Sequence, residues 1–425
     1  MIRFFRDHSL AVLLIACSAT PSLAQQGPAA DAVLDAGTND RSAPVVVSPA
    51  ALEVHRGGYV WDGHNDLPWA MRTVASSSFD QLDIAQRQPK LMTDIPRLRE
   101  GNVGAQFWSV FVPASTGPRG IAFQTTIEQI ELVRTMCQRY PETFAWATTV
   151  AEVDAARRAG KIASLIGVEG GHSIEDSIAN LRRLYQLGAR YMTLTHSRSL
   201  AWADSCTDDP ISGGLSPFGE EVIREMNRLG MLVDLSHVSP ETMLAALRIT
   251  TAPVIYSHSS SRAVADHPRN VGDNILAPIR ENGGVIMVNF YNGFVVPADV
   301  ERSRQRIELE QRLESEGVSE QERKAQVSRW AAKNPPIQGT VHDLVDHIDH
   351  LVKPCGIDHV GLGGDYDGVS MLPKQIEDVS TYPVITQVLL DRGYSAEDIH
   401  KIMYANVYRV FQAAERHAAE SKADN

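Results

Sequence analysis

The sequence predicts an α/β protein folded as a single (β/α)8 barrel. Near-continuous apolar runs of strand length recur along the chain, and such runs are typical of strands buried on both faces of a parallel sheet. Six of the runs end in a histidine, an aspartate or a glutamate. Because a parallel barrel collects its chemistry at the C-terminal ends of its strands, these endings favour a closed ring. An open doubly wound sheet would place its chemistry at one switch point.

Eight runs supply the eight strands of the ring. The runs that end in a potential metal ligand or proton carrier are residues 59–66, 162–169, 191–196, 231–237, 253–258 and 359–365, and residues 103–111 and 284–291 complete the count. Helical periodicity fills the intervals between them. The expected helices are 127–136, 178–187, 218–229 and the closing segment 384–417, with helix starts at Ser239 and Ser395.

One segment interrupts this alternation. Residues 298–338 follow the seventh run and are strongly charged, and they are too long for an ordinary strand-to-helix connection. We expect one or two exposed helices here, inserted into a single barrel domain that spans residues 51–425. The insertion is interpreted either as a solvated excursion or as a flap, because this loop belongs to the catalytic face of a barrel.

Composition limits the classes of partner. The chain has 425 residues, of which 43% are hydrophobic, and a formal net charge of −12. This length and apolar content are sufficient for a large core. The negative charge and the lack of any run of lysines and arginines argue against a nucleic-acid partner or an anionic membrane surface.

The N-terminus is expected to be a targeting segment. Arg3 and Arg6 precede an apolar stretch, and Ser22-Leu23-Ala24 is a typical cleavage site, which makes residues 1–24 a signal peptide. Residues 25–50 are rich in alanine, proline, serine and aspartate and are expected to form a flexible leader.

A lipoprotein signal ending at residue 16 is the alternative. Leu14-Ile15-Ala16-Cys17 resembles a bacterial lipobox, which would leave Cys17 lipidated. Both interpretations export the folded part, which is then periplasmic, secreted or lipid-anchored to a bacterial membrane through Cys17.

Three cysteines follow the leader: Cys137, Cys206 and Cys355. An oxidising compartment permits one disulfide among them and leaves an odd thiol. A bridge between Cys137 and Cys206 across the catalytic face and free thiols at both positions are the two alternatives. None of the three has a spacing typical of a cysteine metal site.

Five side chains at the ends of four runs form the strongest candidate site. Alternate residues of a strand point the same way, so His64 and Asp66 can bind one ion. Glu169 has two carboxylate oxygens, enough to bridge two ions, and His237 and His258 could hold the second. Zinc binds these ligand types and leaves a position for water in catalytic sites. Two ions about 3.5–4 Å apart can activate a hydroxide between them, so the sequence predicts a metal-dependent hydrolase with two Zn²⁺ per chain.

Several motifs also resemble those of the membrane (renal) dipeptidase family. The similar segments are Asp62-Gly-His-Asn-Asp-Leu-Pro-Trp69, Gly167-Val-Glu-Gly-Gly-His172, Leu194-Thr-His-Ser197, Ser257-His-Ser-Ser260 and Gly363-Gly-Asp-Tyr-Asp-Gly368, and the similarity runs from about residue 58 to residue 414. This resemblance implies a dizinc peptidase on an amidohydrolase-like barrel that cleaves small dipeptides through a metal-bridging hydroxide. It implies that His64, Asp66 and Glu169 hold one zinc, and that Glu169, His237 and His258 hold the other. We also expect a homodimer.

The resemblance assigns further roles around the metals. His196 would face the substrate carbonyl, Arg269 would pair with the substrate carboxylate, and Asp365 would handle the proton. Phe294 stands where a tyrosine near the substrate is expected, and Arg198 stands where a cysteine is expected, so no disulfide pattern is transferred. Physical chemistry supports these roles, because arginine binds carboxylates bidentately and amide hydrolysis needs an oxyanion stabiliser and an acid for the leaving amine.

Other polar side chains have plainer interpretations. His172 lies just beyond the Glu169 run and is expected to support the site from behind. His342, His347 and His350 follow a helical pattern and are interpreted as surface or packing residues. Asp367 competes with Asp365 for the proton-handling role, and the loop aspartates could help to recognise a substrate amine; these are Asp204, Asp208 and Asp209.

Two other functions remain as alternatives. An amidohydrolase could act on another small amide, such as an N-acyl amino acid or a β-lactam, and would not require a free amine in its substrate. A barrel that has lost catalysis could serve as a binding protein, but that class is favoured by a missing metal ligand, and all five are present.

Overall fold

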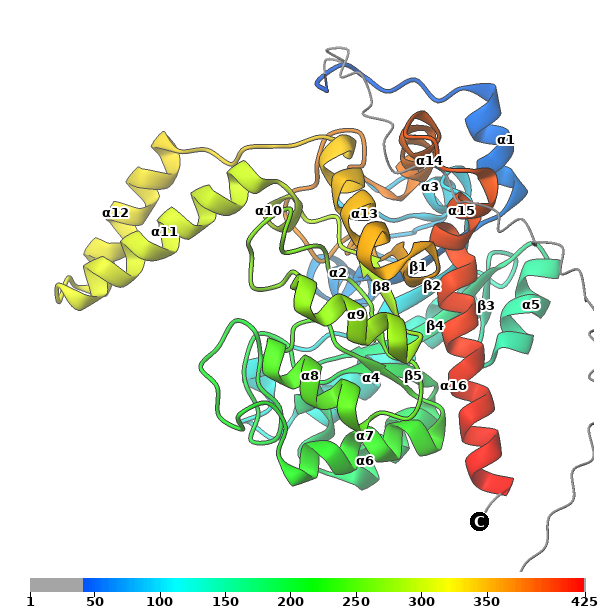
Figure 1. Ribbon diagram of the computed structural model, residues 1–425, viewed down its shortest axis with the longest axis horizontal. Coiled ribbons are helices and arrows are strands. Elements are labelled where there is room, and N and C mark those ends of the chain that lie inside the picture. The colour runs from blue at the N-terminus through cyan, green and yellow to red at the C-terminus, as the bar shows by residue number, and fades with distance from the viewer. Residues whose placement is uncertain (1–40, 424–425) are drawn as a thin grey trace, which may run out of the picture. The chain divides into compact units, whose positions relative to one another are not determined.

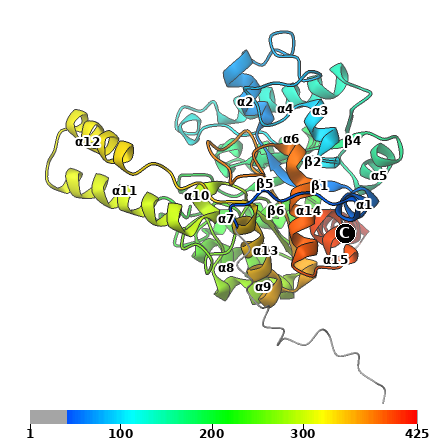
Figure 2. The same cartoon turned by 90° about the horizontal axis from the view of Figure 1, so that it is seen from above.

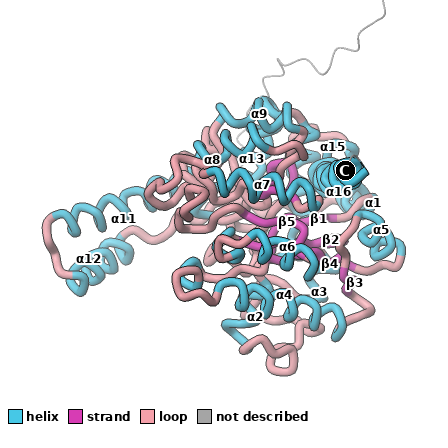
Figure 3. Tube along the Cα trace, turned by 90° about the horizontal axis from the view of Figure 1, so that it is seen from below, coloured by secondary structure: helices cyan, strands magenta, loops and turns pink. Residues whose placement is uncertain are grey.

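Nine parallel strands make up the sheet of the computed structural model, which describes residues 41–423. Eight of them close into a ring in the order β2, β1, β9, β8, β7, β6, β5 and β4, and the pairing of β2 with β4 completes it. Figure 3 shows these strands at the centre, with helices around them. The predicted (β/α)8 barrel is therefore confirmed. The strands are β1 (Val60–Asn65), β2 (Val103–Ser109), β3 (Phe144–Trp146), β4 (Ile162–Glu169), β5 (Ala189–Thr193), β6 (Leu232–Asp234), β7 (Ile255–Tyr256), β8 (Val285–Val288) and β9 (Val360–Leu362).

The ninth strand was not expected. β3 lies outside the ring and pairs only with β4, from Phe144 opposite Ile162 to Trp146 opposite Ser164. Three residues are too few for a strand pattern to stand out in a sequence. The eight strands of the ring, by contrast, are buried along their whole length, as their apolar runs predict.

Most strands end earlier than the apolar runs that predicted them. β5 ends at Thr193, β6 at Asp234 and β9 at Leu362, so the chemically active residues at the ends of these runs lie in the loops that follow. Two of those residues, His237 and Asp365, have φ angles of 67° and 58°. Left-handed backbone of this kind is uncommon outside glycine and is frequent at functional sites. It turns the chain away from the sheet directly above the barrel.

Helices cover the outside of the ring (Figures 1 and 3). The predicted starts at Ser239 and Ser395 are confirmed, because each serine side chain accepts a hydrogen bond from a backbone N–H in the first turn. The helices are α1 (Pro49–Gly57), α2 (Leu67–Ala75), α3 (Ile95–Glu100), α4 (Ala122–Arg139), α5 (Val150–Arg158), α6 (Ile178–Leu187), α7 (Pro217–Leu229), α8 (Pro240–Ile249), α9 (Asp273–Asn282), α10 (Asn292–Val295), α11 (Pro297–Ser315), α12 (Glu320–Lys333), α13 (Val341–Cys355), α14 (Tyr382–Asp391), α15 (Ala396–His400) and α16 (Asn406–Ala423).

The charged insertion forms a helical hairpin of α11 and α12. Figures 1 and 2 show this hairpin projecting away from the barrel. Its surface carries ion pairs within and between turns, such as Arg306 with Glu310 at 2.8 Å and Arg329 with Glu322 at 2.8 Å. This arrangement agrees with the solvated excursion rather than with a flap over the barrel mouth.

The expected alternatives for the cysteines are resolved in favour of free thiols. Cys137 is buried in α4, Cys206 is partly exposed in the loop after β5, and Cys355 is buried at the end of α13, and none of the three forms a disulfide among the described residues. A bridge between Cys137 and Cys206 is therefore wrong for this structure.

The predicted targeting segment lies outside the described residues. This applies to residues 1–24 with both cleavage alternatives, to Cys17, and to the leader as far as residue 40. Among the helices that the structure describes, none is long and apolar enough to cross a membrane.

Candidate metal centre

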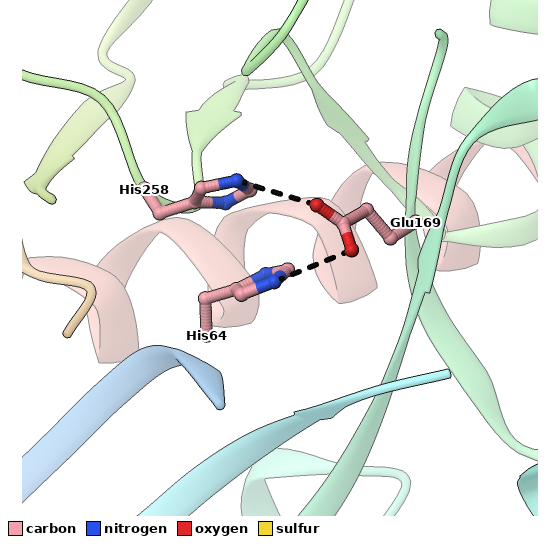
Figure 4. Close-up of side chains that lie close together, drawn as sticks. All are labelled: His64, Glu169 and His258. Carbon is pink, nitrogen blue, oxygen red and sulfur yellow. Dashed lines mark ion pairs between the residues drawn. The ribbon is translucent and has the colours of Figure 1, made fainter. Parts of the chain in front are cut away.

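Glu169 lies at the centre of a cluster of buried side chains that could bind a metal. It is the last residue of β4 and is only 5% exposed. Its Oε1 atom lies 3.1 Å from His237 Nε2 and 3.4 Å from His258 Nε2, and its Oε2 atom lies 3.5 Å from His64 Nε2. Figure 4 shows His64 and His258 facing different oxygens of this carboxylate. One oxygen of the carboxylate therefore faces His64, and the other faces His237 and His258.

The structure brings all five predicted metal ligands together. His64 Nε2 lies 3.2 Å from Asp66 Oδ2, which completes a group of three around Oε2 of Glu169. The Nε2 atoms of His237 and His258 lie 2.9 Å apart and complete a group of three around Oε1. The ligand atoms also fall into overlapping groups within 4.8 Å that include His196 and Asp365.

The protonation of the histidines suits cation binding. Burial lowers the pKa of His237 and of His258 well below the ordinary value, and Arg269 and His64, respectively, lower them further. Both rings are therefore neutral, with lone pairs available to a cation. Burial also opposes a charge on His64, but Tyr191, Glu169 and Asp66 outweigh it and raise the pKa of His64 well above its ordinary value. The same negative surroundings attract a metal cation.

The outward nitrogens of two rings are already bonded. His64 Nδ1 lies 2.9 Å from the Tyr191 hydroxyl, and His258 Nδ1 lies 2.8 Å from the Ser257 hydroxyl. Contacts of this type orient metal-binding imidazoles. With imidazole nitrogen and carboxylate oxygen as the donors, the cluster fits divalent zinc. The donor set therefore fits two ions that share Glu169.

Two further predicted residues lie beside the cluster. His196 follows β5, and its Nε2 atom lies 3.8 Å from Glu169 Oε1; burial lowers the pKa of His196, which keeps the ring neutral. Asp365 follows β9 and accepts a hydrogen bond at 2.8 Å from the side-chain amide of Asn289. Burial raises the pKa of Asp365 to about 8, with Asp66 and Glu169 adding to the effect against His64. Burial therefore favours the protonated form of Asp365.

Arg269 is a buried cation without an acidic partner. The side chain is 3% exposed, and no carboxylate of the described residues pairs with it. Its Nη2 atom donates to the backbone carbonyl of His258 at 3.1 Å, its Nη1 atom donates to Ser259 Oγ at 3.4 Å, and its Nε atom has no partner. The guanidinium lies 5.3 Å from the ring centroid of Phe294. This geometry leaves the guanidinium able to bind an anion.

A cavity of about 540 Å³ joins Arg269 to the ligand cluster. Four of the five candidate ligands line it (Asp66, Glu169, His237 and His258), and no residue of the α11–α12 hairpin does. Aromatic rings form one wall, where the rings of Trp69 and Phe111 are 5.1 Å apart and those of Phe111 and His196 are 4.9 Å apart. A small molecule with an anionic end therefore fits between Arg269 and the cluster.

Comparison with known proteins agrees with this geometry. The family described as Membrane dipeptidase (Peptidase family M19) matches residues 50–425, nearly the whole chain. The chain belongs to this family. It is accordingly a metal-dependent hydrolase that acts on peptide bonds, in agreement with the sequence-based expectation.

Solved structures share the fold of this membrane dipeptidase family member. The probable dipeptidase PvdM from Pseudomonas aeruginosa is 22% identical with a TM-score of 0.77, over 87% of this chain and 98% of that one. A metallo peptidase from Rhodobacter sphaeroides, liganded with a phosphinate mimic of the dipeptide L-Ala-D-Ala, is 22% identical with a TM-score of 0.68, over 84% and 99%. A dipeptidase AC of family M19 is 23% identical with a TM-score of 0.67, over 84% and 98%.

Several polar residues near the site have structural roles in this dipeptidase family member. His172 Nε2 hydrogen-bonds the carbonyl of Val112 at 2.9 Å and reaches no metal ligand. Asp204 accepts backbone N–H groups from Ile211, Ser212 and Gly214, and Asp208 binds Arg198 at 3.0 Å. Neither aspartate lines the cavity, so neither is placed to recognise a substrate amine.

The helical histidines follow the packing interpretation. His347 is buried between two backbone groups, and His350 pairs with Asp273 at 2.9 Å. Asp367 accepts a hydrogen bond from the Met92 backbone at 2.7 Å and lies at the cavity edge. Sequence reasoning did not single out five residues that reach the site from α2 and from the loops after β2, β7 and β8: Trp69, Phe111, His267, Asn289 and Tyr291.

Proposed function

We propose that this protein is a dipeptidase that binds two zinc ions and hydrolyses small dipeptides with a free carboxylate. The observation that carries the proposal is the buried Arg269, which has no carboxylate partner among the described residues and lines the same cavity as Glu169. A buried arginine without a carboxylate is costly unless a ligand supplies one. A dipeptide carries that carboxylate one residue away from its only peptide bond.

The zinc sites would use the five clustered ligands. His64, Asp66 and Oε2 of Glu169 would hold one ion, and Oε1 of Glu169, His237 and His258 would hold the other. Zinc bound in this way polarises a carbonyl group and lowers the pKa of bound water. The phosphinate mimic of L-Ala-D-Ala in the Rhodobacter sphaeroides peptidase supports a dipeptide substrate on this fold.

Side chains beside the cluster would handle the charge and the proton. His196, kept neutral by burial, would present an N–H to the substrate carbonyl oxygen, where negative charge develops. Asp365, whose pKa burial raises, would give a proton to the leaving amine. Asn289 holds the Asp365 carboxyl group in place. Phe294, stacked near Arg269, would contact the carboxylate end of the substrate.

A hydrolysis panel tests this function. Protein loaded with zinc should cleave L,L- or L,D-dipeptides and lose the activity in a chelator. N-acetylated dipeptides and N-acyl amino acids should be poor substrates if the free amine is recognised. Preferential cleavage of N-acyl amino acids, or no cleavage of any dipeptide by protein with both ions bound, would favour one of the alternative functions.

Export is a further part of the proposal and depends on the N-terminal sequence. The signal peptide over residues 1–24 or the lipobox at Cys17 would place the enzyme outside the cytoplasm. Cys17→Ser should release the protein from the membrane fraction if Cys17 is lipidated, whereas soluble export of both forms would support cleavage after Ala24. We also propose a homodimer, which analytical ultracentrifugation of the exported protein would test.

A further inference from the structure

The second contact of His258 leads to a buried aspartate. His258 Nδ1 lies 2.8 Å from Ser257 Oγ, and Ser257 Oγ donates to Oδ2 of Asp234 at 2.6 Å. The other possible acceptors of the Ser257 proton are His258 Nδ1 itself at 2.8 Å and Ser236 Oγ at 3.5 Å. An ionised carboxylate can only accept, so the 2.6 Å contact with Asp234 requires the Ser257 proton. Because a hydroxyl has one proton, Ser257 must accept from His258. His258 therefore carries its proton on Nδ1 and presents an Nε2 lone pair to Glu169 and His237.

Asp234 is fixed on both sides and cannot turn away. It is the last residue of β6 and is fully buried. Its Oδ1 atom accepts the backbone N–H groups of Ser236 at 3.1 Å and Ser257 at 2.8 Å. Its Oδ2 atom accepts the hydroxyl protons of Ser257 and of Thr193, the latter at 2.5 Å. Each oxygen thus has two donors, and the carboxylate ties β5, β6 and β7 together behind His258.

His64, in the other ligand group, also has a hydroxyl group between its Nδ1 atom and an acceptor, but the acceptor is a different one. Its Nδ1 atom lies 2.9 Å from Tyr191 Oη, and Tyr191 Oη donates to the Gly63 carbonyl at 3.2 Å. We call each of these two chains of hydrogen bonds a relay: His258–Ser257–Asp234 and His64–Tyr191–Gly63. The two relays share no residue, and of the two only the His258 relay ends on a carboxylate.

We propose that Asp234 is a positioning residue, which acts through Ser257 to hold His258 as the Nδ1–H tautomer and so keeps its Nε2 lone pair available to a cation. The inference rests on the proposed metal centre. Contacts that orient metal ligands in this way typically contribute about 10–100-fold to metal affinity.

Asp234→Asn provides a sharp test because it changes one atom. The two backbone N–H groups at Oδ1 require the amide oxygen there, so the new NH₂ group faces Ser257 and Thr193. The NH₂ group donates to Ser257 Oγ, and the Ser257 proton must then turn to His258 Nδ1. His258 would carry its proton on Nε2, where it blocks a cation.

Zinc affinity of the full-length protein is the readout, measured by competition with a chromophoric chelator. Asp234→Asn should weaken the binding of one of the two ions by about 10–100-fold and leave the affinity for the other unchanged. The matched control is Thr193→Val, which removes the other hydroxyl from Oδ2 but leaves the Ser257 relay intact, and it should keep both affinities. ¹⁵N NMR of the His258 ring in chelator-treated protein should report the change of tautomer in Asp234→Asn alone.

Several outcomes would overturn the inference. A folded Asp234→Asn protein that binds both ions as tightly as the wild type would do so. If Asp234→Asn does not fold, Ser257→Ala decides, because it removes the relay hydroxyl with little change in volume; unchanged affinity for both ions would refute the role. Wild-type protein that binds two ions but cleaves no dipeptide would refute the proposed function and leave this inference standing.

Discussion

Arg269 and His258 are joined by a hydrogen bond, in which Nη2 of the arginine donates to the backbone carbonyl oxygen of the histidine at 3.1 Å. The proposed carboxylate anchor is therefore fixed to the same turn that carries a proposed metal ligand. The separation between the bound carboxylate and the hydrolysed bond is set by backbone geometry. Such a fixed spacing selects substrates by length.

A blocked carboxylate should be a poor partner for Arg269. A dipeptide amide presents a neutral group, and the lost charge-assisted hydrogen bonds are worth roughly 1.5–3 kcal/mol. At tenfold per about 1.4 kcal/mol, we expect kcat/KM for dipeptide amides to fall by about ten- to a hundred-fold relative to free dipeptides. Arg269→Ala should lose activity on free dipeptides and discriminate far less between the two.

Arg262→Ala is the matched control for this measurement. Arg262 lies on the same loop but pairs with Asp266 at the surface, at 2.7 Å, so its removal should preserve the preference for free dipeptides. Equal rates of wild-type protein on dipeptides and their amides would disprove the anchoring role of Arg269.

Because the two proposed ions have different histidine ligands, one ion should be lost without the other. His237→Ala removes one nitrogen from the group at Oε1 of Glu169 and none from the group around His64 and Asp66. Metal analysis after gel filtration should therefore find close to one ion per chain instead of two, with activity lost. His350→Ala, which changes a surface histidine paired with Asp273, should retain two. Recovery of two tightly bound ions from His237→Ala would remove this residue from the site.

The roles of Asp365 and Asp367 can be distinguished by changing each residue to asparagine. Asp365→Asn cannot give up a carboxylic proton, so kcat should fall by about 10²–10⁴-fold while both ions remain bound. Asp367→Asn disturbs a carboxylate that accepts from the Met92 backbone and should cost stability more than turnover. Comparable losses of kcat in the two variants, measured with zinc saturating, would contradict the assignment of the acid to Asp365.

The barrel could be predicted from sequence because burial on both faces leaves long apolar runs. The strand ends could not, because hydrogen bonding of the sheet stops before the apolar pattern does, as at Thr193 and Leu362. The left-handed backbone at His237 and Asp365 has no sequence signal, since neither residue is glycine. The α11–α12 hairpin was predictable as exposed helix from its charge, but its direction depends on tertiary packing.

The cluster of candidate ligands could be predicted because each lies at or near the end of an apolar run, and the supporting residues could not. Trp69 lies in α2, Phe111 follows β2 and Asn289 follows β8. Only the closed ring brings Trp69 and Phe111 to one cavity and Asn289 to Asp365. A usable signal for Asp62 and Asp234 was present, since a charged residue inside an otherwise apolar strand must be hydrogen-bonded. Asp62 indeed accepts from the backbone of His64 and of Gly364, which joins β1 to the loop after β9.

His347 predicts a specific dependence of stability on pH. The ring lies buried between the loop after β7 and α10: Ser261 N donates to Nδ1 at 2.9 Å, and Nε2 donates to the Val295 carbonyl at 3.0 Å. Since Nδ1 must accept a hydrogen bond, the ring must be neutral. Burial lowers the pKa of His347 from 6.5 to about 4, so between these values the unfolded chain binds a proton that the folded protein does not. Proton uptake by the unfolded chain therefore does not reduce the free energy of unfolding above about pH 6.5, and reduces it progressively as the pH falls towards 4.

Between about pH 6.5 and pH 4, the free energy of unfolding should fall by about 3 kcal/mol because of this ring. The figure follows from a pKa difference of about 2.5 at 1.36 kcal/mol for each pH unit. His347→Gln keeps one donor and one acceptor but does not titrate, so urea unfolding of the variant should weaken less on acidification than that of the wild type. His55, whose pKa burial lowers to about 4, lies in a separate contact with Thr386 and Gly101. His55→Gln should therefore remove its own share of the pH dependence, and the effects of the two variants should add. Parallel curves of unfolding free energy against pH for wild type and His347→Gln would show that this ring does not carry the acid sensitivity.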